Sequence, residues 1–245
     1  MKIIGSDYDG TLNHGGIGED KLTAIKKWQA AGNKFGVISG RHHIFLQELA
    51  GRTGIECDFL IAYNGGMAFT PDGKLISEEL CTDVPPMEFA NDLFDWGCPF
   101  VNMCSREFYR IRRDSANMDP GDVLAEDVPV LDCFYQVSVQ LENEAAAAAM
   151  VKRIAAKYGD KLTPLQNGTC IDTVPKGMNK AVGLDRVRAY YGAAHDDVIA
   201  VGDNLNDADM IRAFRSYAME SGAETLKEMA TYTTKGIVEL IMREL

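Results

Sequence analysis

The sequence predicts an α/β fold with a Rossmann-like parallel sheet as its core and an inserted α+β domain. One observation concerns the core: short apolar runs alternate with helix-length segments in the first and last thirds of the chain. This pattern is typical of parallel strands buried on both faces. The other observation concerns the middle of the chain. Residues 135–141 alternate apolar and polar side chains, which is typical of an antiparallel strand with one open face.

The first predicted strand carries the chain's most distinctive acidic pair. An apolar run begins at Ile3 and ends at Asp7, Asp9 follows two positions later, and Gly10 permits a tight turn. Because side chains alternate along an extended chain, the two carboxylates can point the same way. Like charges this close repel one another, and a divalent cation is a common compensation. Taken alone, the stretch fits a solvated acidic turn equally well.

The remaining core elements alternate between strand and helix. They are a helix over about 19–31, strands over 35–38 and 59–63 with a helix over about 42–53 between them, a hairpin over 66–77, a helix from about 178, and a strand over 198–202. Four of the strands end in a polar residue, namely Asp7, Ser39, Asn64 and Asp203. Since ligands of open α/β sheets bind outside the carboxyl ends of the strands, we expect these four side chains to share one site.

Residues 80–175 are predicted to form the inserted α+β domain, with 1–79 and 176–245 as the core. Within the insertion we expect a helix from Pro86 to about Trp96, strands over 108–112, 135–141 and 170–174, and a helix capped by Asn143. The core face of that last helix is predicted to be Ala147, Met150, Val151, Ile154, Ala155 and Tyr158. Gln136, Ser138 and Gln140 should lie on the half-exposed face of their strand, which is either solvated or turned toward a substrate.

The composition excludes several classes of function. The net charge is −11, and such an acidic chain is poorly suited to bind nucleic acid, whose affinity rests on Lys and Arg. None of the 6 cysteines form a C-x-x-C pair, so we expect reduced, mostly buried thiols in a cytoplasmic protein and no zinc site. No signal peptide or membrane-spanning stretch is evident.

Four motifs stand at predicted strand ends or helix starts. They are Asp7-Tyr8-Asp9-Gly10-Thr11, Ser39-Gly40-Arg41, Lys180, and Gly202-Asp203-Asn204-Leu205-Asn206-Asp207. In this order the set resembles the haloacid dehalogenase (HAD) superfamily of phosphohydrolases. The spacing is most similar to the Cof-type branch, whose type IIB cap is inserted between the second and third motifs and sets substrate specificity. The resemblance covers nearly the whole chain.

The resemblance implies roles for the acidic residues. Asp7 would attack phosphorus and form an aspartyl-phosphate, and Asp9 would act first as general acid and then as general base. Mg²⁺ would be held by the Asp7 carboxylate, the Asp9 backbone carbonyl and Asp203. The chemistry agrees with these roles, because a carboxylate must approach a phosphate dianion that repels it. A divalent cation and a Lys ammonium remove that repulsion.

The other site residues are assigned with alternatives left open. Lys180 matches the catalytic Lys of the family by position, and Lys176 is the competitor, interpreted as a solvated loop cation. Ser39 and Gly40 are predicted to bind phosphate, although Ser39 could equally be a plain helix N-cap. Arg41 is predicted to contact the leaving group, with an exposed helix-start position as the alternative.

The remaining candidate residues lie in the last motif and near the ends of the second and third predicted strands. Asn206 is predicted to bind phosphate and Asp207 to support the metal and Lys180, with helix capping as the alternative. His42 and His43 are interpreted as surface helix residues. Asn64 either joins the site or makes a local turn with the glycine that follows it.

The leading prediction is a Mg²⁺-dependent phosphatase that hydrolyses a small phosphorylated metabolite. A sugar phosphate is the first expectation, from the resemblance alone. A phosphomutase would use the same aspartyl-phosphate, and a receiver-type signalling module also combines an acidic cluster, a Ser or Thr, a Lys and Mg²⁺. The sequence addresses neither the exact substrate nor the oligomeric state.

Overall fold

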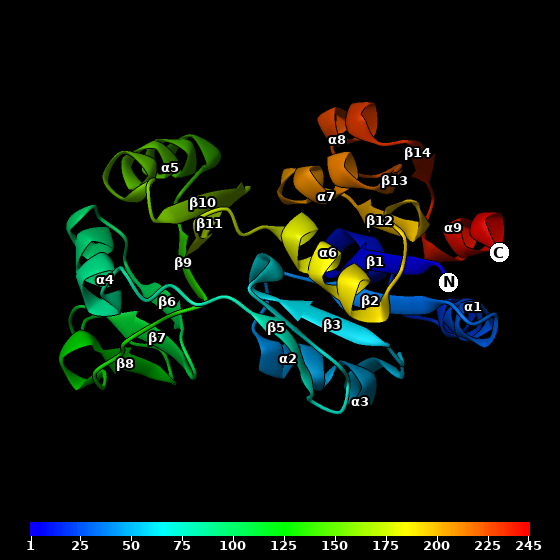
Figure 1. The fold of residues 1–245 in the computed structure, drawn as a ribbon. Helices are drawn as coiled ribbons and strands as arrows, with labels where there is room; N and C mark the ends of the chain where they lie inside the picture. Colours follow the sequence, from blue (N-terminus) through cyan, green and yellow to red (C-terminus); the bar gives the residue numbers. More distant parts are fainter. The chain divides into compact units, whose positions relative to one another are not determined.

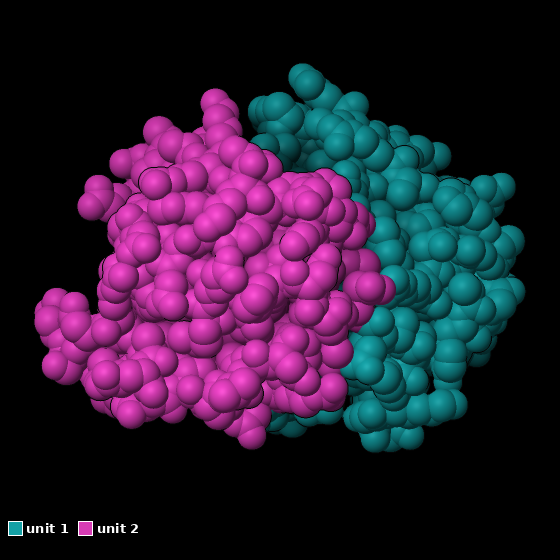
Figure 2. All heavy atoms as spheres, turned by 60° about the vertical axis from the view of Figure 1, so that its left-hand side comes forward, with its two compact units in different colours: residues 1–78, 179–245 teal, residues 79–178 magenta.

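The computed structural model describes residues 1–245 and divides into two compact units. The first unit comprises Met1–Glu78 and Asn179–Leu245, and the second comprises Glu79–Met178 (Figure 2). The segment predicted as the insertion therefore falls within the second unit. Its role as a cap that sets specificity stays a prediction.

An eight-stranded sheet forms the centre of the first unit, in the order β14-β13-β12-β1-β2-β3-β4-β5 (Figure 1). Its strands are β1 (Ile3–Asp7), β2 (Lys34–Ile38), β3 (Phe59–Ala62), β4 (Met67–Phe69), β5 (Leu75–Glu78), β12 (Val198–Gly202), β13 (Arg215–Met219) and β14 (Tyr232–Thr234). The strands from β14 to β3 pair in parallel, whereas β4 and β5 form the antiparallel hairpin at one edge. The central strands β1 and β12 are buried along their whole length. This burial explains why they read as continuous apolar runs rather than as alternating ones.

Seven helices belong to this unit. They are α1 (Glu19–Ala30), α2 (His43–Gln47), α3 (Leu49–Thr53), α6 (Lys180–Tyr191), α7 (Ala208–Ala213), α8 (Glu224–Met229) and α9 (Ile237–Glu244). Leu184 of α6 and Ile211 of α7 share a core cluster with Ile3 of β1. None of the helices in the structure is long and apolar enough to cross a membrane.

Two local predictions for this unit need correction. The single helix expected over 42–53 is two short helices, because Glu48 between them has φ −81° and ψ −4°, far from the helical ψ of about −42°. The strand expected to reach Tyr63 ends at Ala62 instead. Tyr63 and Asn64 have positive φ values of 55° and 51°, which turn the chain out of the sheet.

The second unit is a six-stranded sheet with two helices, in the order β10-β11-β9-β6-β7-β8. Its elements are α4 (Pro86–Asp95), β6 (Val101–Cys104), β7 (Phe108–Arg112), β8 (Asp122–Leu124), β9 (Gln136–Gln140), α5 (Glu144–Tyr158), β10 (Leu162–Asn167) and β11 (Cys170–Pro175). Phe89 of α4 and Ile154 of α5 share a core cluster with Met103, Val137 and Ile171 of the sheet. Both helices therefore pack on the same face, and the residues that alternate with these three point to the other face.

The burial of two residues in this unit differs from the prediction. Ala155, expected in the core face of α5, is exposed, because it lies one residue, about 100° of helix rotation, beyond the buried Ile154. Gln136, expected on a half-exposed face, is buried, and its Nε2 donates to Ser138 Oγ at 2.9 Å. All six cysteines are free thiols, four of them buried and Cys57 and Cys170 partly buried.

Candidate active site

The chain reverses sharply where β1 ends at Asp7. Residues 8–12 form one tight turn, closed by the Asn13 N–H donating to the Tyr8 carbonyl at 2.9 Å. Gly10 has φ +82°, and a Cβ at this position would lie 2.4 Å from Asp203 Oδ2. Glycine is therefore needed here both for the backbone conformation and for the close approach of Asp203.

A buried ammonium links two of the predicted acidic residues. Lys180 opens α6 and is 1% exposed. Its Nζ donates to Asp7 Oδ1 and to Asp207 Oδ1, both at 2.6 Å. Burial lowers the pKa of Lys180, but the carboxylates of Asp207 and Asp7 outweigh it and raise the pKa above its ordinary value. The side chain therefore stays a cation at neutral pH.

The competing lysine has a different environment. Lys176 is exposed and donates to the Gly159 carbonyl within the second unit. The structure thus places Lys180, and not Lys176, against Asp7 and Asp207.

Asp207 is held by contacts on both carboxylate oxygens. Lys180 occupies Oδ1, while Oδ2 accepts from the backbone N–H of Asp203 at 3.0 Å and of Asn204 at 3.2 Å. A Cβ on Gly202 would lie 2.4 Å from Oδ2, so glycine leaves the space in which this carboxylate sits. With both oxygens engaged, Asp207 is placed to position Lys180 and the loop after β12.

The capping alternative holds for Asp207 alongside its contact with Lys180, because Asp207 Oδ2 accepts from the Asn204 N–H as part of a capping box. Asn204 caps the turn at Leu205–Asp207 by accepting from the Leu205 N–H at 2.8 Å, and α7 begins only at Ala208. Asn206 is partly buried within that turn. Its predicted contact with phosphate stays a prediction.

Three carboxylates gather around this ammonium. Oxygens of Asp7, Asp203 and Asp207 lie within 4.8 Å of one another. Burial raises the pKa of Asp7 well above its usual range, opposed by Lys180, while the charges of Asp207 and Asp203 raise it further. Burial also raises the pKa of Asp203. The cluster therefore carries more negative charge than its single ammonium offsets.

This donor set fits a divalent cation. Asp7 Oδ2 is buried and has no hydrogen-bond donor, and such an orphaned carboxylate oxygen is the ligand that Mg²⁺ or Ca²⁺ prefers. Asp203 uses Oδ1 to accept from Thr11 Oγ1 at 2.7 Å, which leaves Oδ2 for a cation. Asp207 has no such oxygen left. Asp7 and Asp203 therefore fit the predicted ligand roles, and Asp207 fits a supporting one.

Sequence reasoning missed the role of Thr11. Its hydroxyl is buried at the end of the turn and orients Asp203 through the hydrogen bond just described. The signal was present in the sequence, because a hydroxyl residue directly after Gly10 lies in the same turn as both predicted aspartates.

Asp9 and Arg41 form an ion pair at the mouth of this cluster. The Arg41 guanidinium donates to both Asp9 oxygens, from Nε at 2.7 Å and from Nη2 at 2.8 Å. It lies 4.2 Å from the ring centre of Phe45 and 5.7 Å from that of Tyr8. The hydrogen bond to Asp9 raises the pKa of Arg41. The predicted contact of Arg41 with the leaving group stays a prediction. In the structure Arg41 is exposed and binds the predicted general acid. Tyr8, to which we gave no role, is buried and supports this pair.

Ser39 follows β2 at the same edge of the sheet. Asp7 is in register with Ile38, so Ser39 lies beside the carboxyl end of β1. Its Oγ accepts from the Arg41 N–H at 3.2 Å, and its carbonyl accepts from the Asn64 N–H at 3.0 Å. Gly40 joins Ser39 to Arg41 and is partly exposed. The phosphate-binding roles of Ser39 and Gly40 stay predictions.

The helix N-cap alternative for Ser39 is wrong. The N-cap of α2 is His42, whose Nδ1 accepts from the Phe45 N–H at 3.2 Å. His42 and His43 are also not plain surface residues. Both are partly buried, His43 Nδ1 lies 2.7 Å from the Tyr63 hydroxyl, and burial lowers the pKa of each.

Comparison with known proteins places the chain in a family. The sequence model of the haloacid dehalogenase-like hydrolases matches residues 4–238. The chain therefore belongs to this family of hydrolases, in its Cof-type branch of subclass IIB. The class defined by fold and sequence is that of phosphatases, which hydrolyse phosphoric monoesters of small metabolites. Membership of this class of phosphatases rejects the alternative of a receiver-type signalling module.

Two relatives by sequence and one solved structure show how similar this chain is to individual proteins. The 5-amino-6-(5-phospho-D-ribitylamino)uracil phosphatase YwtE of Bacillus subtilis (strain 168) is 33% identical over 96% of this chain and 93% of its own. YitU, a phosphatase of the same name and organism, is 42% identical, over 49% of this chain and 45% of its own. The solved structure of the HAD subclass IIB sugar phosphatase BT4131 superposes with a TM-score of 0.77, covering 100% of this chain and 99% of that one at 19% identity. That structure shares the fold.

Proposed function

We propose that the protein hydrolyses a phosphate monoester carried on a sugar or sugar-alcohol chain, through an aspartyl-phosphate at Asp7 and with Mg²⁺. The observation that carries this proposal is the buried Lys180 ammonium held between Asp7 and Asp207, next to an Asp7 oxygen without a donor. The names of the relatives support the substrate class. Two act on a phosphorylated ribityl group and a third on a sugar phosphate.

In the first step, a carboxylate oxygen of Asp7 attacks phosphorus. The new bond joins Asp7 to phosphorus as the ester P–O bond breaks, and Asp9 delivers a proton to the departing oxygen, so that the alcohol leaves neutral. Lys180 reduces the repulsion between the attacking carboxylate and the phosphate dianion. Ser39, Gly40 and Asn206 bind the phosphoryl oxygens through N–H and side-chain groups in this proposal.

In the second step, water attacks the same phosphorus atom. Asp9, now ionised, takes the proton from this water, and the bond between Asp7 and phosphorus breaks. Inorganic phosphate leaves, and the carboxylate of Asp7 is restored. Arg41 binds both Asp9 oxygens in the structure, so this ion pair has to open when Asp9 carries the proton of the first step.

The cation would be held by the Asp7 carboxylate, the Asp9 backbone carbonyl and Asp203. When bound, Mg²⁺ would offset the negative charge that gathers on the phosphoryl oxygens. Thr11 and Gly10 contribute by orienting Asp203 and leaving room for it.

The test is phosphate release from a panel of monoesters with Mg²⁺ present or chelated. The panel holds 5-amino-6-(5-phospho-D-ribitylamino)uracil, ribitol 5-phosphate, hexose phosphates and nucleotides. We expect multiple turnovers on a sugar or sugar-alcohol ester and none after Asp7→Asn. A phosphomutase would move the phosphoryl group to another hydroxyl without releasing phosphate. That result, or substantial turnover by Asp7→Asn, would overturn the proposal.

A further inference from the structure

A single side chain holds the loop over residues 12–16, which we call the tethered loop. Lys21, in the first turn of α1, donates from Nζ to the backbone carbonyls of Leu12 at 2.8 Å, His14 at 2.6 Å and Gly16 at 2.7 Å. An ammonium has three N–H donors and no acceptor. These contacts therefore use its whole capacity for hydrogen bonds.

The carbonyls of this stretch alternate between two kinds of partner. Those of Thr11 and Asn13 accept from the backbone, from the His14 N–H at 3.2 Å and the Gly16 N–H at 3.0 Å. The three carbonyls bound by the ammonium accept no backbone hydrogen bond. Gly15 and Gly16 have φ values of +68° and +82°, the left-handed conformations that let the chain curl around the cation. Without the cation, three gathered carbonyl oxygens would face one another unpaired.

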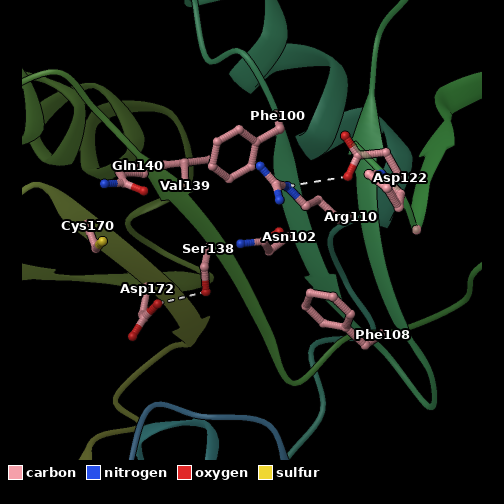
Figure 3. Close-up of a pocket in the computed structure, with 12 residues that line it drawn as sticks. Phe100, Asn102, Phe108, Arg110, Asp122, Ser138, Val139, Gln140, Cys170 and Asp172 are labelled. Atoms are coloured by element: carbon pink, nitrogen blue, oxygen red, sulfur yellow. Dashed lines mark hydrogen bonds and ion pairs between the residues drawn. The ribbon is translucent and has the colours of Figure 1, made fainter. Parts of the chain in front are cut away.

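The position of Lys21 is unfavourable for α1 itself. A cation near a helix N-terminus opposes the helix dipole, whereas acidic residues such as Glu19 and Asp20 favour it. Basic side chains elsewhere pair with carboxylates. In a pocket of about 630 Å³ in the second unit, for example, Arg110 lies 3.4 Å from Asp122 (Figure 3). Lys21 instead directs its hydrogen bonds to carbonyls, so its contacts serve the loop and not the helix that carries it.

The tethered loop is continuous with the turn that contains Asp9. Leu12, the last residue of that turn, is fully buried. Its carbonyl belongs to the same planar peptide group as the Asn13 N–H, which closes the turn by donating to the Tyr8 carbonyl at 2.9 Å. A donor on the carbonyl of a peptide also strengthens the hydrogen bond made by its N–H. Lys21 thus holds the peptide group that closes the turn.

We infer that Lys21 is a positioning residue of the active site, which fixes the turn that presents Asp9. The inference rests on the proposed function for the role of Asp9 as general acid, and it goes beyond that function by assigning a residue outside the turn. Lys21 acts through the backbone and contacts no reacting atom itself. Once the ammonium is removed, the turn opens at its closing hydrogen bond and Asp9 delivers its proton less effectively. Asp7 keeps its place, because it lies on β1 and is held by Lys180.

The first experiment needs no substrate. Amide hydrogen exchange of the full-length protein, measured residue by residue by NMR, reports the closing hydrogen bond of Asn13. We expect Lys21→Met to speed exchange at Asn13 about tenfold or more, while the amides of β12 keep their rates. Lys26→Met, which replaces an exposed lysine of the same helix, is the matched control and should change neither.

A more conservative variant separates charge from geometry. Lys21→Arg keeps the cation, but its N–H groups lie in one plane and cannot reach three converging carbonyls equally well. Its exchange rate at Asn13 should fall between those of wild type and Lys21→Met. It also serves as the test variant if Lys21→Met does not fold.

The second experiment compares two kinds of phosphate ester. An alkyl ester, the faster of ribitol 5-phosphate and glucose 6-phosphate, needs a proton on its leaving oxygen, whereas 4-nitrophenol leaves as a stable anion without one. Lys21→Met should therefore lower kcat/KM about tenfold or more for the alkyl ester and less than about threefold for 4-nitrophenyl phosphate. A variant that only folds less well would lower both values equally. Lys21→Arg should recover part of the loss on the alkyl ester.

The inference and the proposed function fail on different results. Unchanged exchange at Asn13 in Lys21→Met, or an equal loss of kcat/KM for both esters, would overturn the inference. Either result leaves the proposed function standing as long as wild-type protein releases phosphate. Conversely, wild-type protein that releases no phosphate from any ester would reject the proposed function, and faster exchange in Lys21→Met would still support the hold of Lys21 on the turn.

Discussion

Replacing Lys180 by Met tests the centre of the proposed site. Methionine keeps much of the side-chain volume but removes the ammonium that donates at 2.6 Å to Asp7 and at 2.6 Å to Asp207. Lys180 is 1% exposed, so water cannot take its place easily. Removing one partner of a buried ion pair costs about 3–5 kcal/mol. If about 3 kcal/mol of this cost appears as lost stabilisation of the transition state, the rate of hydrolysis falls by about a hundredfold or more.

The assay is phosphate release under saturating Mg²⁺, with Lys176→Met as the matched control. Lys176 is exposed and contacts only a backbone carbonyl of the second unit in the structure, so its replacement should change turnover by less than about twofold. The reasoning fails if Lys180→Met keeps half of the wild-type turnover, or if the two variants lose activity equally.

The same variant should show a changed pH dependence of stability in the absence of divalent cations. Lys180 lowers the pKa of Asp7, which burial raises, so without the ammonium that pKa rises further. The folded variant then retains a proton on Asp7 at pH values where the unfolded chain has released it. Its free energy of unfolding therefore falls, relative to wild type, as the pH rises from the unfolded pKa of about 3.9 through the raised folded value. Urea denaturation at pH 5 and pH 8 measures this difference, and a difference of the opposite sign would contradict the assignment.

Three further predictions concern Gly10, Asp203 and Cys98. Gly10→Ala should lower the melting temperature and turnover together, since a left-handed residue with a Cβ costs about 1–2 kcal/mol and the added atom would lie 2.4 Å from Asp203; unchanged values of both would contradict the close approach. Asp203→Asn should abolish the rise in melting temperature that Mg²⁺ gives wild-type protein, measured by differential scanning fluorimetry, and an undiminished rise would place the cation elsewhere. Burial raises the pKa of Cys98 to about 11, so the folded state keeps a thiol proton that the unfolded chain loses above about pH 8.5. Stability should therefore fall between pH 8.5 and 11 by up to about 1.4 kcal/mol per pH unit from this group, and an equally steep fall in Cys98→Ala, by urea denaturation, would disprove the contribution.

Local pattern was sufficient for most of the fold. The continuous apolar runs predicted β1, β2, β3 and β12 to within a residue or two, because strands buried on both faces need apolar side chains at every position. The strict alternation around Val137 predicted β9, because a strand with one covered face and one open face needs apolar side chains only at every second position. Helix boundaries near Glu48 were less predictable, since a single backbone angle decides whether one helix becomes two.

By itself, the sequence determined the class of protein and predicted most residues of the candidate site. The acidic pair, Lys180 and the Gly202–Asp207 segment are recognisable from their order and from their positions at strand ends, and both properties are local. The tertiary structure alone decided how these residues meet. Lys180 contacts Asp7 across 173 positions of sequence, Thr11 orients Asp203, and Arg41 binds Asp9. Register and close approach arise from packing between distant segments, and no local pattern of side chains specifies them.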